Sequence, residues 1–172
     1  GKTSEMCELA YIELQQLMDS VEFHLNEKLD NDTTNYNLLF EKAKLPVKLQ
    51  KAKKELENNG FDYASSEGIV YITQNRSFVI RHLLSYFTKT MQTYLIQIDK
   101  ENKEGFMEDA GITITPQQYV DRVIWHENFI VENPDFVLLK NCKMYKKAYL
   151  TYLLTGIDNT SLYDYEDDSK LS

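Results

Sequence analysis

The chain has 172 residues, a mass of 20.2 kDa and a formal net charge of −8, with 42% hydrophobic and 27% charged residues. These values are ordinary for a soluble globular protein, and we predict a single domain over residues 1–172 whose last residues, 166–172, form a frayed tail. The acidic excess excludes a nucleic acid as the main partner, because neutralising phosphates requires a surplus of Lys and Arg. Since no apolar run of about 18 residues occurs, the sequence predicts no transmembrane segment.

Turn-forming residues are scarce, with six Gly and three Pro in the whole chain. A sandwich or barrel with many tight turns usually contains more of them. We therefore predict an all-α fold, a single-domain helical bundle of about five helices with an irregular loop near 61–75.

The first predicted helix covers residues 4–29, where apolar residues recur at helical spacing. That stripe consists of Met6, Leu9, Ala10, Leu14, Leu17, Val21 and Leu25. A second helical region covers about 34–59, and Pro46 within it predicts a break near Leu45, because proline removes a backbone donor. Gly60 follows this region and suits the left-handed conformation that ends many helices.

The segment between these helices, DNDTTNYNLLFE (30–41), offers oxygen atoms at positions 1, 3, 5 and 12 of a calcium-binding loop. Those residues are Asp30, Asp32, Thr34 and Glu41. Position 6 of such a loop is normally Gly, whereas here it is Asn35. The sequence therefore favours a helix–helix turn with N-capping residues, and the lysines that follow are predicted to form a solvated helix face.

Residues 61–73, FDYASSEGIVYIT, differ from the rest of the chain by their glycine and their β-branched run. They predict an irregular loop with at most one short extended segment, at 69–73. Because loops carry function more often than packed stripes do, Glu67, Tyr71 and Arg76 are the candidate binding residues, expected to shape a small polar pocket. The alternative is a loop that only crosses a helix end.

Three further helices are predicted in the second half of the chain. The first covers about 76–104, with apolar residues in a seven-residue rhythm, and is expected to be central. The next begins at the capping box of Thr115, Pro116 and Gln118 and runs to about 132. The last is predicted to begin at Asn133-Pro134 and to end at Gly156.

Other chemistry finds little support in the sequence. His126-Glu127 begins like a zincin helix, but position 130 is Ile130, so the second histidine of that motif is absent. No G-x-S-x-G motif and no glycine-rich phosphate loop occur. We therefore assign no catalytic residue, no cofactor and no metal, and we predict that Cys7 and Cys142 are not bridged.

Three stretches carry a resemblance to known proteins: NGFDYASSEGIVYI (59–72), YVDRVIWHENFIVENPDF (119–136) and YLLTGIDNTSLYDY (152–165). They resemble uncharacterised exported bacterial proteins, often lipoprotein-like and helical. The helix pair joined at NPDF is also similar to a tetratricopeptide-type hairpin, although the Trp–Leu–Gly–Tyr pattern of that repeat is missing. The resemblance covers about residues 59–165 and implies an exported, surface-attached helical protein without a defined activity.

These observations lead to a non-enzymatic binding or interaction module of an exported bacterial protein, whose partner is a protein, a small molecule or a surface ligand. The alternatives are a small helical enzyme that uses carboxylates of the loop at 65–72, and a cytoplasmic adaptor or regulatory domain. An upstream lipobox cysteine is expected for the first hypothesis. Residues 157–165 are predicted to fold back along the helices, with Leu162 and a tyrosine partly buried.

Overall fold

The computed structural model describes residues 3–41, 44–108 and 111–156. These residues belong to two compact units, one within Gly1–Asp99 and one within Lys100–Ser172. Helices make up 69% of the described residues, so the prediction of a mainly helical protein is confirmed. An all-α fold is wrong, because the described residues also form two small antiparallel sheets. The single domain and the bundle stay predictions, and the predictions for residues 157–172 lie outside the described residues.

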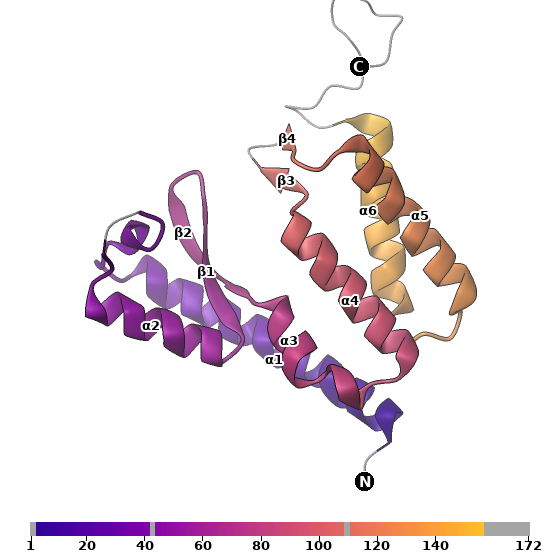
Figure 1. Ribbon diagram of the computed structural model, residues 1–172, viewed down its shortest axis with the longest axis horizontal. Coiled ribbons are helices and arrows are strands. Elements are labelled where there is room, and N and C mark those ends of the chain that lie inside the picture. Colours follow the sequence, from indigo (N-terminus) through magenta and orange to yellow (C-terminus); the bar gives the residue numbers. More distant parts are fainter. Residues whose placement is uncertain (1–2, 42–43, 109–110, 157–172) are drawn as a thin grey trace, which may run out of the picture. The chain divides into compact units, whose positions relative to one another are not determined.

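The elements of the first unit, in chain order, are α1 (Ser4–Asp30), the short 3-10 helix η1 (Tyr36–Leu39), α2 (Val47–Asn58), β1 (Phe61–Ser66), β2 (Ile69–Gln74), α3 (Arg76–His82), the 3-10 helix η2 (Leu84–Tyr86) and the first part of α4 (Lys89–Glu104) (Figure 1). The second unit holds the end of α4, then β3 (Met107–Glu108), β4 (Gly111–Ile112), α5 (Pro116–Glu132) and α6 (Leu139–Thr155).

Helix α1 has the predicted bounds to within one residue, but its buried side is not the predicted apolar stripe. Leu9 and Leu17 are exposed, whereas Glu8 is buried. The Glu8 carboxylate accepts hydrogen bonds from the backbone N–H and the hydroxyl of Thr88. The hydrogen bonds to Thr88, which is distant in the sequence, therefore bury the side of the helix that carries Glu8. Apolar spacing alone does not reveal this side.

The second helical region breaks at Pro46, as predicted. Helix α2 begins at Val47, and the described residues of the region before it include the short η1. The stop at Gly60 is also confirmed, because its φ of +85° lies in the left-handed region.

The predicted irregular loop near 61–75 is wrong, because β1 and β2 form a regular antiparallel hairpin. Its two-residue turn is Glu67-Gly68, and both residues have positive φ, 51° and 77°. Positive φ at both central positions is what a type I′ turn requires, and the twist of that turn matches the twist of the strands. The hairpin was missed because Glu is an uncommon residue at the first of these positions.

Replacing Glu67 with Asn is expected to raise the free energy of unfolding of the first unit by about 1 kcal/mol, because Asn tolerates the left-handed region better than Glu. Urea unfolding and amide exchange of β1 and β2 measure the change. Glu67→Gln, which removes the charge but keeps the length and shape of the side chain, is the control and should change stability by less than about 0.5 kcal/mol. Equal effects of the two substitutions would refute the backbone explanation.

The hairpin is held between the two long helices of the first unit, with β2 beside α1 and β1 beside α2. The side-chain amide of Asn26, on α1, bonds both backbone groups of Ile72 at 2.8 Å each, donating to the carbonyl and accepting from the N–H. In this way α1 satisfies both backbone groups of Ile72 on the outer edge of β2, which pairs with no third strand among the described residues.

The predicted helix over 76–104 is wrong in its continuity, because α3, η2 and α4 are separate. The backbone is extended at Phe87, with φ −94° and ψ 162°. Thr88 then accepts a hydrogen bond from the N–H of Met91 at 3.3 Å, as an N-cap of α4. The hydrogen bonds between Thr88 and Glu8 fix this break. The apolar residues keep their seven-residue spacing across it, so the sequence pattern does not reveal it.

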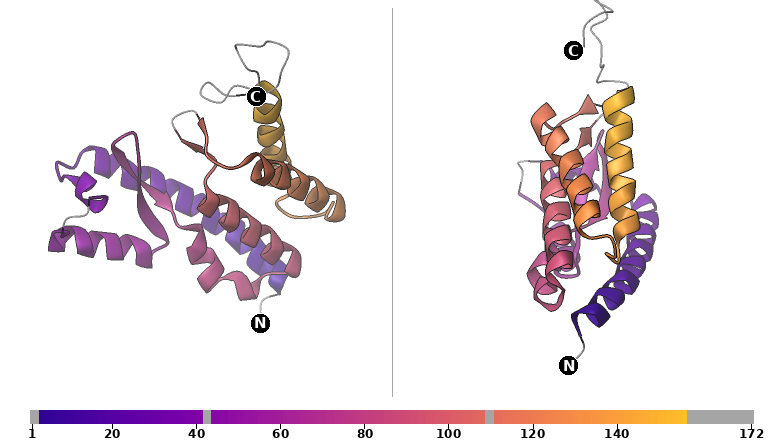
Figure 2. Two further views of the ribbon diagram at one scale, coloured as in Figure 1. Left: turned by 45° about the horizontal axis from the view of Figure 1, so that its top comes forward. Right: turned by 90° about the vertical axis from the view of Figure 1, so that its right-hand side faces the viewer.

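In the second unit, α5 begins as predicted, with the complete capping box at Thr115 and Gln118. Helix α6 begins at Leu139, five residues later than predicted, because Asn133 caps the end of α5 through its side chain. The two helices pack against each other as an antiparallel pair (Figure 2). Gly156, with φ +68°, ends α6 as predicted.

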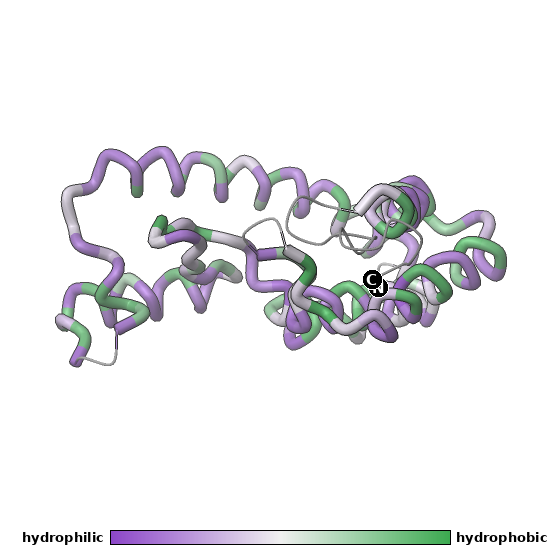
Figure 3. The backbone as a smooth tube through the Cα atoms, turned by 90° about the horizontal axis from the view of Figure 1, so that it is seen from above, coloured by the Kyte–Doolittle hydropathy of each residue, from purple (hydrophilic) through white to green (hydrophobic). Residues whose placement is uncertain are grey.

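Polar and apolar residues are interleaved along the helices, and in Figure 3 no helix is green throughout. Over the described ranges, none of the helices combines the length and the apolar character that crossing a bilayer needs. Cys7 and Cys142 are both free thiols, one in each unit.

Candidate functional site

The three residues predicted to shape a polar pocket do not come together. Glu67 is exposed at the tip of the hairpin, and Arg76 follows its base as the first residue of α3. The six residues of β2 lie between them, a strand length of about 20 Å. Tyr71 is 40% exposed, and the Arg76 guanidinium contacts Gln15 of α1 at 3.4 Å.

The register of the hairpin shows which of its faces is turned inward. Tyr63 pairs with Ile72, and Phe61 lies two residues before Tyr63, so the three side chains share one face. Phe61 and Ile72 are buried there with Met18 of α1. Tyr71 pairs with Ala64 on the opposite face, which explains its exposure.

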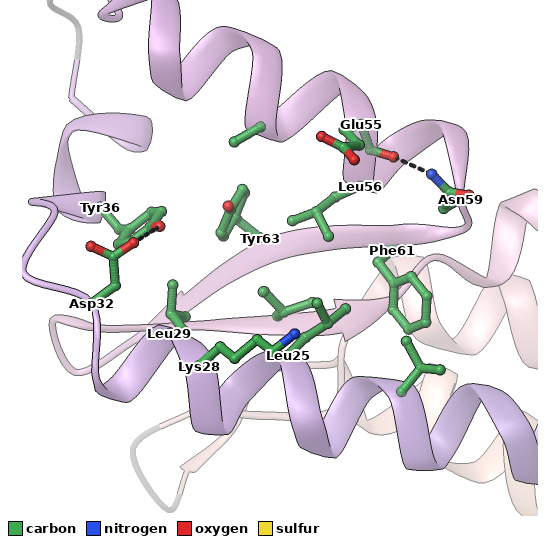
Figure 4. Close-up of a pocket in the computed structure, with 13 residues that line it drawn as sticks. Leu25, Lys28, Leu29, Asp32, Tyr36, Glu55, Leu56, Asn59, Phe61 and Tyr63 are labelled. Carbon is green, nitrogen blue, oxygen red and sulfur yellow. Dashed lines mark hydrogen bonds between the residues drawn. The ribbon is translucent and has the colours of Figure 1, made fainter.

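A cavity of about 570 Å³ opens on this inward face, between α1, α2 and the hairpin (Figure 4). Its volume falls within the range of about 300–1,000 Å³ that small-molecule pockets usually have. Leu25 and Leu29 reach it from α1, Leu56 from α2 and Phe61 from β1. The remaining apolar lining residues are Val21, Ala52 and Ile72. The cavity is therefore an apolar space inside a cluster that would otherwise be counted as core.

One end of the cavity carries a hydrogen-bonded group of polar residues centred on Asp32. Its Oδ1 accepts from the backbone N–H of Thr34 at 2.9 Å and from the Thr34 hydroxyl at 2.7 Å. Its Oδ2 accepts from the Tyr36 hydroxyl at 2.8 Å. The Thr34 hydroxyl, then Tyr36 and the Thr34 N–H, lower the pKa of Asp32 to about 2.

These bonds also fit the turn interpretation of 30–41, since Asp32 closes a local turn onto Thr34. Asn35 caps η1 by accepting from the N–H of Asn37. Over the part of the chain that the structure describes, no group of three or more His, Cys, Asp or Glu side chains is arranged to hold a metal ion.

Two tyrosines stand next to Asp32 at this end. The rings of Tyr36 and Tyr63 lie 5.5 Å apart between centroids and are tilted by 31°. Burial, followed by the hydrogen bond to Asp32, raises the pKa of Tyr36 to about 12. Burial, followed by the Asp32 charge, also raises the pKa of Tyr63, so both phenols are neutral at physiological pH. Both tyrosines line the cavity.

Two charged residues on opposite walls complete the lining: Lys28 on α1 and Glu55 on α2. Within the described ranges, neither charged group takes part in a hydrogen bond or ion pair. The backbone carbonyl of Glu55 accepts from the Asn59 side chain at 2.8 Å, which leaves the Glu55 carboxylate unengaged.

The second unit contains a buried polar cluster made by α4, α5 and α6. The His126 Nε2 lies 3.1 Å from the Glu101 carboxylate, and the Tyr149 hydroxyl donates to the same carboxylate at 2.8 Å. Arg122 donates through Nη2 to Glu104 at 2.9 Å and to the backbone carbonyl of Gly105 at 2.7 Å. Burial, followed by the Glu101 charge, raises the pKa of Tyr149.

The centre of this cluster is closed to solvent, since His126 is 0% and Arg122 2% exposed, whereas the Glu104 side chain at its margin is 21% exposed. Its bonds join the end of α4 to both other helices and fix the turn at Gly105. The His126 Nδ1 and the Arg122 Nε have no hydrogen-bond partner among the described residues. Because a substrate has no route to these groups in a packed core, we interpret the cluster as structural.

Comparison of the chain with known protein families, curated proteins and solved structures found no match. The arrangement of the side chains therefore supplies the functional argument.

Sequence reasoning missed the cavity because its walls come from three separate segments. Leu25, Leu29 and Leu56 have ordinary core spacing in their helices, and no pattern in a sequence distinguishes a filled core from one with space left in it. The one available signal was the alternation of apolar Phe61, polar Asp62 and apolar Tyr63, which marks a half-buried strand rather than a loop.

Proposed function

We propose that the chain is a non-enzymatic binding module whose first unit takes an elongated apolar ligand into the cavity between α1, α2 and the hairpin. The observation that carries this proposal is the cavity of about 570 Å³ with walls of Leu25, Leu29, Leu56 and Phe61. Apolar walls with a few polar groups at one end are typical of sites that bind small molecules.

We further propose an extracytoplasmic setting for this module, a proposal that rests on the expected resemblance of residues 59–165 to exported, lipoprotein-like bacterial proteins. The enzyme alternative finds no support in the arrangement of Glu67, Tyr71 and Arg76, which lie at opposite ends and on the outer face of the hairpin. The pKa of Asp32, which lines the cavity, is lowered to about 2 by hydrogen bonds within its own turn, so these bonds give it a structural role.

A series of straight-chain alcohols tests the cavity, with 1-hexanol, 1-octanol and 1-decanol as calorimetric probes. Each methylene that enters an apolar site contributes about 0.8 kcal/mol, so binding should tighten about fourfold per added methylene until the space is filled. No binding of any alcohol to the folded protein would refute the proposal, and the cavity would then be only an imperfection of the core.

The location of binding is tested with Ala52→Phe, which places a ring in the cavity. This substitution is expected to weaken 1-octanol binding at least tenfold, because it occupies the space that the alkyl chain needs. Ala10→Phe adds the same ring at an exposed position of α1 and should leave binding within twofold. Equal affinity of both variants would place the alcohol elsewhere.

A further inference from the structure

The charged groups around the cavity differ in how many hydrogen bonds they already make with other groups of the protein. Asp32 accepts three hydrogen bonds, two from Thr34 and one from Tyr36. Lys48 lies near the same end, and its ammonium donates to the Thr34 hydroxyl at 3.3 Å. This end is therefore internally satisfied, and its negative charge is already bound to donors of the protein.

Lys28 is placed differently. It lies three residues after Leu25 and next to Leu29 on α1, and its stem lines the same wall (Figure 4). A lysine in this position covers apolar surface with its methylenes and keeps its ammonium at the edge. Since this ammonium has no hydrogen bond or ion pair with the described residues, all three of its donors are available to a ligand.

Two charged groups of the lining are unengaged, one of each sign. Lys48 is not one of them, because its ammonium already donates to the Thr34 hydroxyl and its charge acts on Asp32. The unengaged groups are the Lys28 ammonium on α1 and the Glu55 carboxylate on the opposite wall. Lys48 is four residues before Ala52 and seven before Glu55, on the stripe of α2 that faces the cavity. The Lys28 ammonium, beside Leu25 and Leu29, is therefore the group that an anionic head reaches next to the apolar wall.

We infer that the ligand of this cavity is an anionic amphiphile with a single alkyl chain, whose chain lies between Leu25, Leu29 and Leu56 and whose acidic head pairs with Lys28. This inference rests on the proposed function of the same cavity and adds the chemical class of the ligand. A fatty-acid-like carboxylate has both features, an apolar chain and one compact negative group.

The test compares decanoate, 1-decanol and decyltrimethylammonium by calorimetry on the intact chain, the two ions below their critical micelle concentrations and 1-decanol below its solubility limit. Lys28→Met keeps the apolar stem and removes the charge. It should weaken decanoate about threefold, the size expected for a solvent-exposed ion pair, and leave 1-decanol within twofold. Lys54→Met, an exposed lysine of α2 outside the lining, should change neither. Added salt should reduce the decanoate effect.

Glu55→Gln separates an anionic from a cationic ligand. If the inference holds, this substitution strengthens decanoate and leaves it the tighter ligand. An unchanged decanoate affinity in Lys28→Met would overturn the inference. It would also be overturned if decyltrimethylammonium bound more tightly than decanoate and its binding weakened in Glu55→Gln. Failure of 1-decanol to bind would instead refute the proposed function of the cavity, so the two failures are distinguishable.

Discussion

Replacing Arg122 with Met is expected to destabilise the second unit by about 3–5 kcal/mol, because one partner of a buried ion pair is removed. The Nη2 of Arg122 donates to the Glu104 carboxylate at 2.9 Å and to the backbone carbonyls of Glu101 at 3.1 Å and Gly105 at 2.7 Å. Methionine fills similar space but donates to none of them, so buried acceptors lose their partner.

Unfolding by urea, followed through Trp125 fluorescence, measures this loss directly. Trp125 is the single tryptophan of the chain, and it stacks on Phe129 within α5 at 4.8 Å between ring centroids. Arg81→Met is the matched control, because Arg81 is exposed on α3 of the first unit, and it should change stability by less than about 0.5 kcal/mol. A loss below about 1 kcal/mol for Arg122→Met would show that the network is dispensable.

Replacing Gly60 with Ala is expected to destabilise the first unit by about 2–4 kcal/mol. Two physical effects add here. The φ of +85° strains any side-chain-bearing residue, and a β-carbon at this position would lie 3.0 Å from Cδ1 of Phe78 and 3.1 Å from Cε of Met18. The Phe78 ring must shift before the new methyl group fits.

Gly68→Ala separates these two effects. Gly68 has a similar φ of +77°, but a β-carbon there would meet nothing within 4 Å. Its substitution should therefore cost about 1 kcal/mol, from backbone strain alone. Urea unfolding monitored by amide exchange of β1 and β2 compares the two variants. Equal losses would contradict the packing contribution at Gly60.

The features that sequence reasoning predicted well are those determined by neighbouring residues. The capping box at Thr115 and Gln118 and the break at Pro46 are confirmed because the interacting groups lie within a few positions of each other. Gly60 and Gly156 are confirmed for the same reason, since each ends a helix through its own backbone conformation.

The errors concern contacts between distant segments. The break before α4 depends on Glu8, 80 positions away from Thr88, and the burial of Glu8 displaces the core face of α1. The hairpin depends on pairing between strands and on a turn in which Glu67 adopts a conformation more usual for Asn or Gly.

For the candidate site, the sequence predicted the chain segment involved but not the residues that line the cavity. The segment around residues 61–72 does contribute to the cavity, through Phe61, Tyr63 and Ile72, but with its apolar face rather than with Glu67 or Tyr71. Residue type identifies which side chains tend to be buried, whereas the remaining volume depends on how α1 and α2 are spaced around the hairpin. That spacing is a property of the folded unit.

The amide of Asn26 has a consequence for the behaviour of the protein at high concentration. A two-stranded hairpin has open edges, and an open edge recruits strands of other molecules into aggregates. By occupying both backbone groups of Ile72, Asn26 removes the central attachment point on the β2 edge. On the β1 edge, the N–H of Tyr63 donates to its neighbour Asp62 at 2.9 Å. Each edge thus carries a side chain that blocks intermolecular strand pairing and favours a dispersed state.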